Sequence, residues 1–130
     1  MLTSCVVSGN VAHGVSADAA NVVLKGSIVI GNNICGCCFA NDSTADAAET
    51  TVSGNRNDGL LHLGGSQCSV YVRVSCSGNN KSGLHLTQAS LVSIKESAFT
   101  KNMRNGIRVE EGSTAMAENC RYTARNVCTT

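Results

Sequence analysis

Short segments in which apolar and polar residues alternate recur along the whole chain. Five of them follow a glycine and place an apolar residue on each side of a variable one, at residues 15–17, 37–39, 61–63, 84–86 and 107–109. The third copy is shifted by one residue, because Leu60 is interpreted as an insertion. A period of two predicts strands with one buried and one exposed face. A second strand follows a loop of small or polar residues, as at residues 70–74 and 91–94.

An Asn with a Gly four positions later marks each repeat. The five pairs are Asn10 with Gly14, Asn32 with Gly36, Asn55 with Gly59, Asn79 with Gly83, and Asn102 with Gly106. They follow one another at intervals of 22, 23, 24 and 23 residues, and Asn126 comes 24 residues after Asn102 without its glycine. Three positions before each Asn stands an apolar residue: Val7, Val29, Val52, Cys76 and Phe99. This period is typical of a solenoid and is about half that of a β-propeller blade.

The repeats predict an all-β fold, a single-stranded right-handed parallel β-helix of about five to six coils of 22–24 residues. Each coil is expected to run strand, loop, strand and tight Gly/Asn turn. We expect the motif glycines to take positive φ at a sharp corner, and the Asn side chains to stack as a hydrogen-bonded ladder. Residues 1–130 are expected to form one domain. Because neither end offers a capping helix, we expect a fragment or a subunit with incomplete terminal coils.

Composition agrees with a narrow interior filled by small and β-branched side chains. The chain has no Trp, no Pro, two Phe, two Tyr and thirteen Gly. The formal charge of +1 excludes broad electrostatic attraction to polyanions, so nucleic-acid binding is not expected. No apolar run reaches the length needed to span a bilayer.

The repeat resembles the right-handed parallel β-helix repeats (PbH1 type) of the pectate-lyase-like superfamily. It is most similar to the short repeats of carbohydrate-binding and sugar-hydrolase domains and of the solenoid region of certain F-box proteins, and the likeness covers residues 5 to 126. The resemblance implies the fold. It leaves function open, because that superfamily includes lyases, hydrolases, epimerases, adhesins and interaction modules. The Asn-Thr-Asp, Asp-Asp, Gly-His-Gly and Arg-Ile-Lys motifs of polygalacturonase-like members are absent here, and no catalytic residue is assigned.

The middle positions of the first strands are expected to point outward and to stack about 5 Å apart. They are Ser16, Cys38, His62, His85 and Arg108. His62, His85 and Arg108 then form a candidate binding stripe for an acidic sugar, a phosphate or an acidic partner surface. The alternative is that they are ordinary solvent-facing residues. No third ligand joins the two His, so neither a metal site nor a cofactor is expected.

Eight cysteines suggest disulfides if the protein is secreted, and Cys35 and Cys38 have Cys-x-x-Cys spacing. However, no signal peptide is seen, and Cys37 and Cys76 fall in inward positions. Buried cysteine acts as a small hydrophobe, so we interpret most cysteines as reduced core residues of a soluble, intracellular protein. The redox state of Cys35, Cys38, Cys120 and Cys128 stays open.

Two functions remain. The first is a non-enzymatic structural or protein-interaction solenoid, a component of a larger assembly that contacts a protein partner or further copies of itself through its coil ends or a flat sheet. The second is a carbohydrate-binding or polysaccharide-cleaving domain, acting as a lyase or glycoside hydrolase if it is an enzyme and taking an oligosaccharide. Missing catalytic motifs and the lack of aromatic sugar platforms favour the first.

Overall fold

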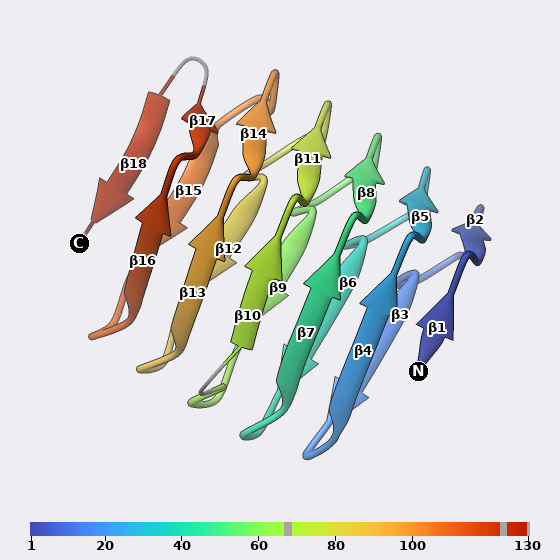
Figure 1. The fold of residues 1–130 in the computed structure, drawn as a ribbon, viewed down its shortest axis with the longest axis horizontal. Helices are drawn as coiled ribbons and strands as arrows, with labels where there is room; N and C mark the ends of the chain where they lie inside the picture. Colours follow the sequence, from blue (N-terminus) through green and yellow to red (C-terminus); the bar gives the residue numbers. More distant parts are fainter. Residues whose placement is uncertain (67–68, 123–124, 130) are drawn as a thin grey trace.

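A computed structural model describes the chain except residues 67–68, 123–124 and 130, and except the side chains of residues 125–129. The described residues contain no helix; they form three parallel six-stranded sheets, one on each side of a right-handed solenoid (Figure 1). Each strand pairs with its counterpart one coil away. The predicted all-β parallel β-helix is therefore confirmed.

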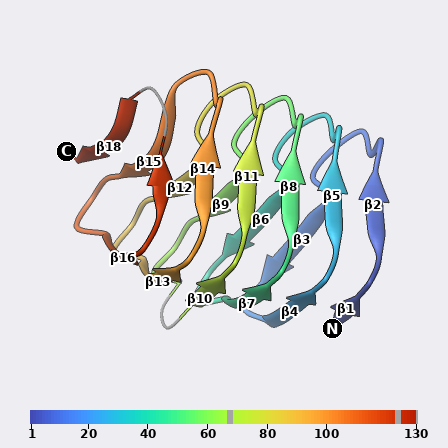
Figure 2. The same ribbon diagram turned by 45° about the horizontal axis from the view of Figure 1, so that its top comes forward.

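The three sheets are named A, B and C in the order in which the chain enters them (Figure 2). Sheet A contains β1 (Leu2–Thr3), β4 (Asn21–Lys25), β7 (Thr44–Ala48), β10 (Ser69–Val72), β13 (Leu91–Lys95) and β16 (Thr114–Glu118). Sheet B contains β2 (Val6–Ser8), β5 (Ile28–Ile30), β8 (Thr51–Ser53), β11 (Ser75–Ser77), β14 (Ala98–Thr100) and β17 (Arg121–Tyr122). Sheet C contains β3 (Val15–Asp18), β6 (Cys37–Ala40), β9 (Leu60–His62), β12 (Leu84–Leu86), β15 (Asn105–Val109) and β18 (Arg125–Thr129).

Each coil thus holds three strands, where the alternation predicted two. The additional strands form sheet B, and the apolar column three residues before each Asn is the inward row of that sheet. In β5, for example, Val29 is fully buried between two outward-facing isoleucines. Strands of two or three residues are too short to display a period of two, which is why the pattern showed their buried residue but not the strand.

The register of the third coil differs from the prediction. Leu60 pairs with Cys37 and with Leu84, so Leu60 is not an insertion. The spacing between paired residues rises from 23 at Phe39 and His62 to 24 at Asp46 and Val70. The additional residue of this coil therefore lies in the turn after His62, where a loop can absorb it without turning a strand over.

The core is a single column of apolar side chains that fills the space between the sheets. Its largest fully buried members are Tyr71, Phe39, Phe99, Leu24, Leu60, Leu84, Leu86, Ile94 and Ile107. No coil holds more than one Phe or Tyr ring, and alanines such as Ala45 and Ala47 fill inward positions beside larger neighbours. The low aromatic content of the sequence matches this narrow interior.

The Asn ladder runs along the corner between sheets B and C. The side chains of Asn10, Asn32, Asn55, Asn79 and Asn102 are linked in sequence by Nδ2–H···Oδ1 hydrogen bonds of 2.8, 3.0, 2.9 and 3.0 Å. Each receiving Oδ1 also accepts a hydrogen bond from the backbone N–H of the Asn one coil before. The predicted ladder is confirmed, and its members from Asn32 to Asn102 are buried.

The motif glycines are required for a reason other than the predicted positive φ. A Cβ atom added to Gly14, Gly36, Gly59 or Gly83 would lie 2.6–2.8 Å from Nδ2 of the ladder Asn of the next coil. Positive φ occurs instead one residue before each ladder Asn, at Gly9, Gly31, Gly54, Gly78 and Lys101. The ladder asparagines themselves do not have positive φ. These four motif glycines are therefore kept by close packing of neighbouring coils.

Candidate functional site

The outer face of sheet C carries a column of side chains that includes a histidine and an arginine. Its middle column runs Ser16, Cys38, Leu61, His85 and Arg108. Beside it, at the position before each motif glycine, runs a second column of His13, Cys35, Asp58, Ser82 and Asn105. Stacked coils bring equivalent residues to about 4.8 Å from one another, so side chains far apart in sequence become neighbours.

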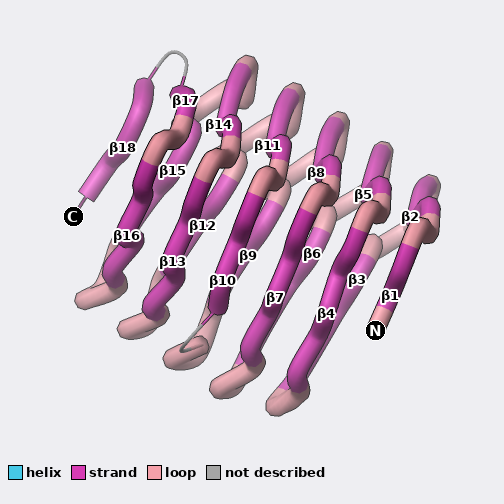
Figure 3. The backbone as a smooth tube through the Cα atoms, in the orientation of Figure 1, coloured by secondary structure: helices cyan, strands magenta, loops and turns pink. Residues whose placement is uncertain are grey.

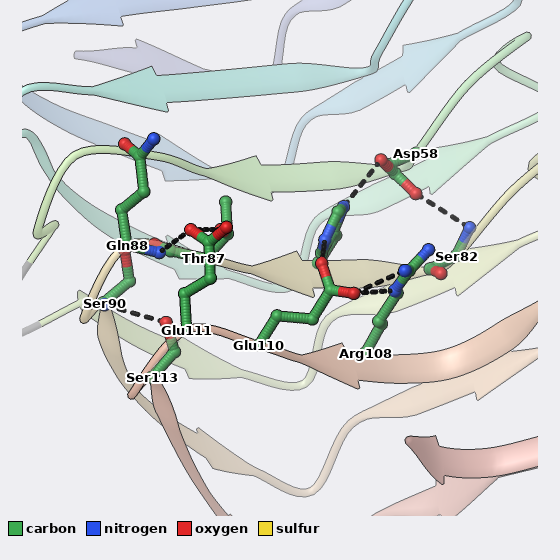
Figure 4. Close-up of polar contacts among 10 residues, drawn as sticks. Asp58, Ser82, Thr87, Gln88, Ser90, Arg108, Glu110, Glu111 and Ser113 are labelled. Carbon is green, nitrogen blue, oxygen red and sulfur yellow. Dashed lines mark hydrogen bonds and ion pairs between the residues drawn. The ribbon is translucent and has the colours of Figure 1, made fainter. Parts of the chain in front are cut away.

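His85 lies between two carboxylates that come from the coils on either side. Its Nδ1 lies 3.2 Å from Oδ2 of Asp58, and its Nε2 lies 2.8 Å from Oε2 of Glu110. Arg108 donates from Nε to Oε1 of Glu110 at 2.8 Å, and its Nη2 contacts the same oxygen. We call Asp58, His85, Arg108 and Glu110 the sheet C ion-pair cluster (Figure 4).

The cluster favours the charged forms of His85 and Glu110. Hydrogen bonding to Asp58 raises the pKa of His85 above its ordinary value, against the opposing effect of partial burial, and Glu110 adds to the rise. The hydrogen bond from His85 lowers the pKa of Glu110, helped by Arg108. With His85 protonated, two cations face two anions, so the cluster balances its own charge.

Asp58 is the most buried member, with 3% of its surface exposed. Its Oδ1 accepts a 2.9 Å hydrogen bond from the backbone N–H of Ser82, while Oδ2 faces His85. Such hydrogen-bonding partners offset the cost of burying a carboxyl group. The Oγ of Ser82 is buried and has no hydrogen-bond partner among the described residues.

Glu111 belongs to a separate group at the turn between sheets C and A, although it follows Glu110 directly. Its Oε2 accepts hydrogen bonds from Oγ1 of Thr87 at 2.5 Å and from the backbone N–H of Gln88 at 3.2 Å. Figure 4 shows Glu110 and Glu111 directed to different partners. Glu110 and Glu111, although adjacent in the sequence, therefore do not act as a pair.

Of the predicted binding stripe, the structure brings His85 and Arg108 together on the outer face and separates His62 from them. His62 pairs with Phe39 and Leu86 in the inward row and is fully buried. Its Nε2 contacts the hydroxyl of Tyr71, its Nδ1 has no partner among the described residues, and burial lowers its pKa to about 3. The outward placement of His62 was wrong, because Leu61 occupies that position.

The sequence analysis did not place Asp58 and Glu110 beside the stripe. Asp58 directly precedes motif residue Gly59, and Glu110 directly follows inward-facing Val109. Both positions flank the outward column on which His85 lies. Aligning every coil on its motif glycine, without the shift at Leu60, would have placed them beside His85.

The described cysteines Cys5, Cys35, Cys37, Cys38, Cys76 and Cys120 are free thiols. Cys37 and Cys76 are fully buried, as predicted for core residues. Burial raises the pKa of Cys35 to about 12 and also raises the pKa of Cys38, which keeps both as unreactive thiols at neutral pH. The side chain of Cys128 lies outside the described residues. No cluster of three metal-binding side chains occurs in the part of the chain that the structure describes.

Sheet A presents a different surface, on which apolar side chains are exposed. Val23, Val70 and Met116 are 37%, 39% and 54% exposed, although they stand in the middle of three strands of one sheet. A hollow of about 300 Å³ opens over Ala48 between Val23, Val70 and Val72. No described element covers the outer face of this sheet, which is turned toward the viewer in Figure 3.

The described residues contain no helix with the length and apolar character needed to cross a membrane. Comparison with protein families, with curated proteins and with solved structures yields no match for this chain.

Proposed function

We propose that this chain is a non-enzymatic protein-interaction solenoid that contacts its partner through the outer face of sheet A. The observation that carries the proposal is the exposure of Val23 and Val70 at the hollow over Ala48, together with exposed Met116 on the same face. Exposed apolar side chains that gather around a hollow, as Val23 and Val70 do here, are typical of interaction sites. We also assign the repeat to the pectate-lyase-like β-helix group and, because the described cysteines are free thiols, place the protein inside the cell.

The sheet C ion-pair cluster favours a structural role over a catalytic one. A general acid at neutral pH needs a raised carboxyl pKa, whereas the pKa of Glu110 is lowered. His85 is bonded at both ring nitrogens and Arg108 is bonded to Glu110. Before His85 or Arg108 could transfer a proton to a substrate or bind one, it would have to break these contacts.

Site-specific photo-crosslinking tests the proposal. A benzophenone amino acid replaces Val70 on sheet A in one variant and exposed Ser16 on sheet C in a matched control, and crosslinks are formed in cells that produce the protein. We expect protein crosslinks from position 70, identified by mass spectrometry at defined residues of one partner, and few from position 16. Equal crosslinking at both positions, or none at position 70, would contradict the proposal.

Carbohydrate binding is the second candidate. It is supported by the alternation of donors and acceptors from Arg108, Glu110, His85 and Thr87 on adjoining coils, a pattern that suits sugar hydroxyls. A panel of neutral and acidic oligosaccharides, tested against the intact protein and against Arg108→Ala and His85→Ala, distinguishes the two functions. Binding or cleavage that both substitutions abolish would favour the sugar function and count against the first.

A further inference from the structure

The charges on the outer face of sheet A are arranged in a pattern that complements itself. One outward column runs Lys25, Ala48, Val72, Lys95 and Glu118 from the second to the sixth strand of the sheet. The neighbouring outward column runs Val23, Asp46, Val70, Ser93 and Met116. The two columns hold two cations and two anions, so the face is neutral as a whole, and its centre at β10 is apolar.

We infer that the partner of this face is a second copy of the same chain, packed sheet A against sheet A with the two solenoid axes antiparallel. The inference rests on the proposed function and adds the identity of the partner. Consider a twofold axis that lies in the interface plane and runs parallel to β10. It places each column opposite the same column of the second copy with the order of the coils reversed, so that β4 faces β16 and β7 faces β13. Packed sheets keep their strands nearly aligned, which is the strand orientation that this axis produces.

This operation places complementary residues opposite each other. Lys25 meets Glu118 of the second copy, Val23 meets the second copy's Met116, and Val70 and Val72 each meet their own equivalents at the centre. Lys25 and Asp46 have no ion pair with any described residue of their own chain, and Lys95 and Glu118 share only a 3.8 Å contact. Charges left in this state are available to a partner and orient it.

The hollow over Ala48 provides an independent argument from shape. Ala48 lies opposite Lys95 of the second copy, the longest side chain in that column. The aliphatic stem of lysine can fill an apolar hollow while its ammonium group reaches a neighbouring carboxylate. Here the carboxylate is Asp46, which lines the same hollow. The small residue, the long cation and the unpaired acid therefore fit one arrangement.

Sheet B offers no comparable match. Val6, Ile28 and Ile30 are exposed on its outer face, but the outward residues of its next two strands are only Ser and Thr. No charged column on that sheet would set the direction of a second copy. Sheet C, in turn, satisfies its charges internally. Sheet A is the face on which charge and shape select the same partner.

The expected dimer is weak. The five strands of the face cover about 20 Å along the axis, and their outward residues cover about 16 Å along the strands. Such a patch is smaller than the roughly 800 Å² that each partner buries in a standard interface. Self-association should therefore depend on concentration and become weaker as salt screens the charge pairs.

Sedimentation equilibrium of the purified full chain over a concentration series tests the inference. We expect a monomer–dimer equilibrium that Val70→Glu abolishes and that Ile28→Glu on sheet B and Ser16→Glu on sheet C leave unchanged. Lys25→Glu and Glu118→Lys should each weaken self-association by about tenfold or more. An equimolar mixture of these two variants should associate again, because every Lys25–Glu118 contact then regains opposite charges.

Restoration in the mixture also shows that both variants are folded. A chain that stays monomeric at every concentration, or a dimer that responds to Ile28→Glu and not to Val70→Glu, would overturn the inference. If position 70 crosslinks to a different protein in cells while the purified chain is monomeric, the interaction function stands and only the identity of the partner is wrong. If neither crosslinks nor dimers form, both proposals fail.

Discussion

A Cβ atom on Gly59 would lie 2.8 Å from Nδ2 of Asn79 in the next coil. The same Nδ2 donates to Oδ1 of Asn102 at 3.0 Å, so it cannot move aside without breaking the ladder. The backbone carbonyl of Gly83 lies 2.7 Å from the same added atom. Glycine and asparagine in this motif are therefore one packing unit that extends over two coils.

Gly59→Ala should lower the free energy of unfolding by about 2–4 kcal/mol, because overpacking a rigid site displaces backbone and ladder together. Chemical denaturation followed by circular dichroism measures the change. Gly31→Asn is the matched control: Gly31 has positive φ, which Asn tolerates, and nothing lies within 4 Å of an added Cβ. Equal destabilisation by both substitutions would show that the close contact is not the cause.

Asn79→Ala should cost about 2–4 kcal/mol, since it removes the acceptor of the N–H and Nδ2 groups of Asn55 and leaves buried donors unpaired. Exposed Asn80, the next residue along the chain, provides the control. Asn80→Ala should stay within about 0.5 kcal/mol of the unmodified protein. Comparable thermal midpoints for the two variants would argue against a stabilising ladder.

Buried His62 should make the protein sensitive to acid. Its folded pKa of about 3 lies below its ordinary value of 6.5, so the unfolded chain takes up a proton first. The contribution of neutral His62 to the free energy of unfolding is fully present above pH 6.5. It falls by about 1.4 kcal/mol per pH unit as the pH decreases toward 3. In the double variant His62→Phe/Tyr71→Phe, the loss of stability between pH 7 and pH 4 should shrink. An unchanged pH dependence would contradict this assignment.

His85 should show the opposite dependence. Its folded pKa is raised, so its contribution is complete below the ordinary pKa of 6.5 and is lost as the pH rises through the raised value. NMR titration of the imidazole resonances should find His85 protonated at a higher pH than His62. Asp58→Asn should lower the pKa of His85, because Asp58 provides the largest favourable interaction. A His85 pKa that is insensitive to Asp58→Asn would exclude the proposed geometry.

Sequence alone predicted the coils, the stacking of Asn32, Asn55 and Asn79, and the burial of Cys37 and Cys76, because each follows from a constant period and one inward row. It did not predict sheet B, whose strands are too short to alternate. It misplaced His62, because Leu60, Leu61 and Leu63 are all apolar and permit two registers, and only strand pairing distinguishes them. The Asp58–His85–Glu110 contacts were missed because they depend on that register.

The additional residue of the third coil also bears on how such a chain can change length. Because it lies in the turn between His62 and Val70, every strand keeps its inner and outer faces, and the asparagines above and below remain in line. Removing or duplicating one complete coil would likewise leave equivalent strands paired with each other in the same register. A residue added inside a strand would instead turn the inward-facing side chains outward as far as the next turn. This architecture therefore tolerates the gain or loss of whole coils, and of single residues in the turns between strands.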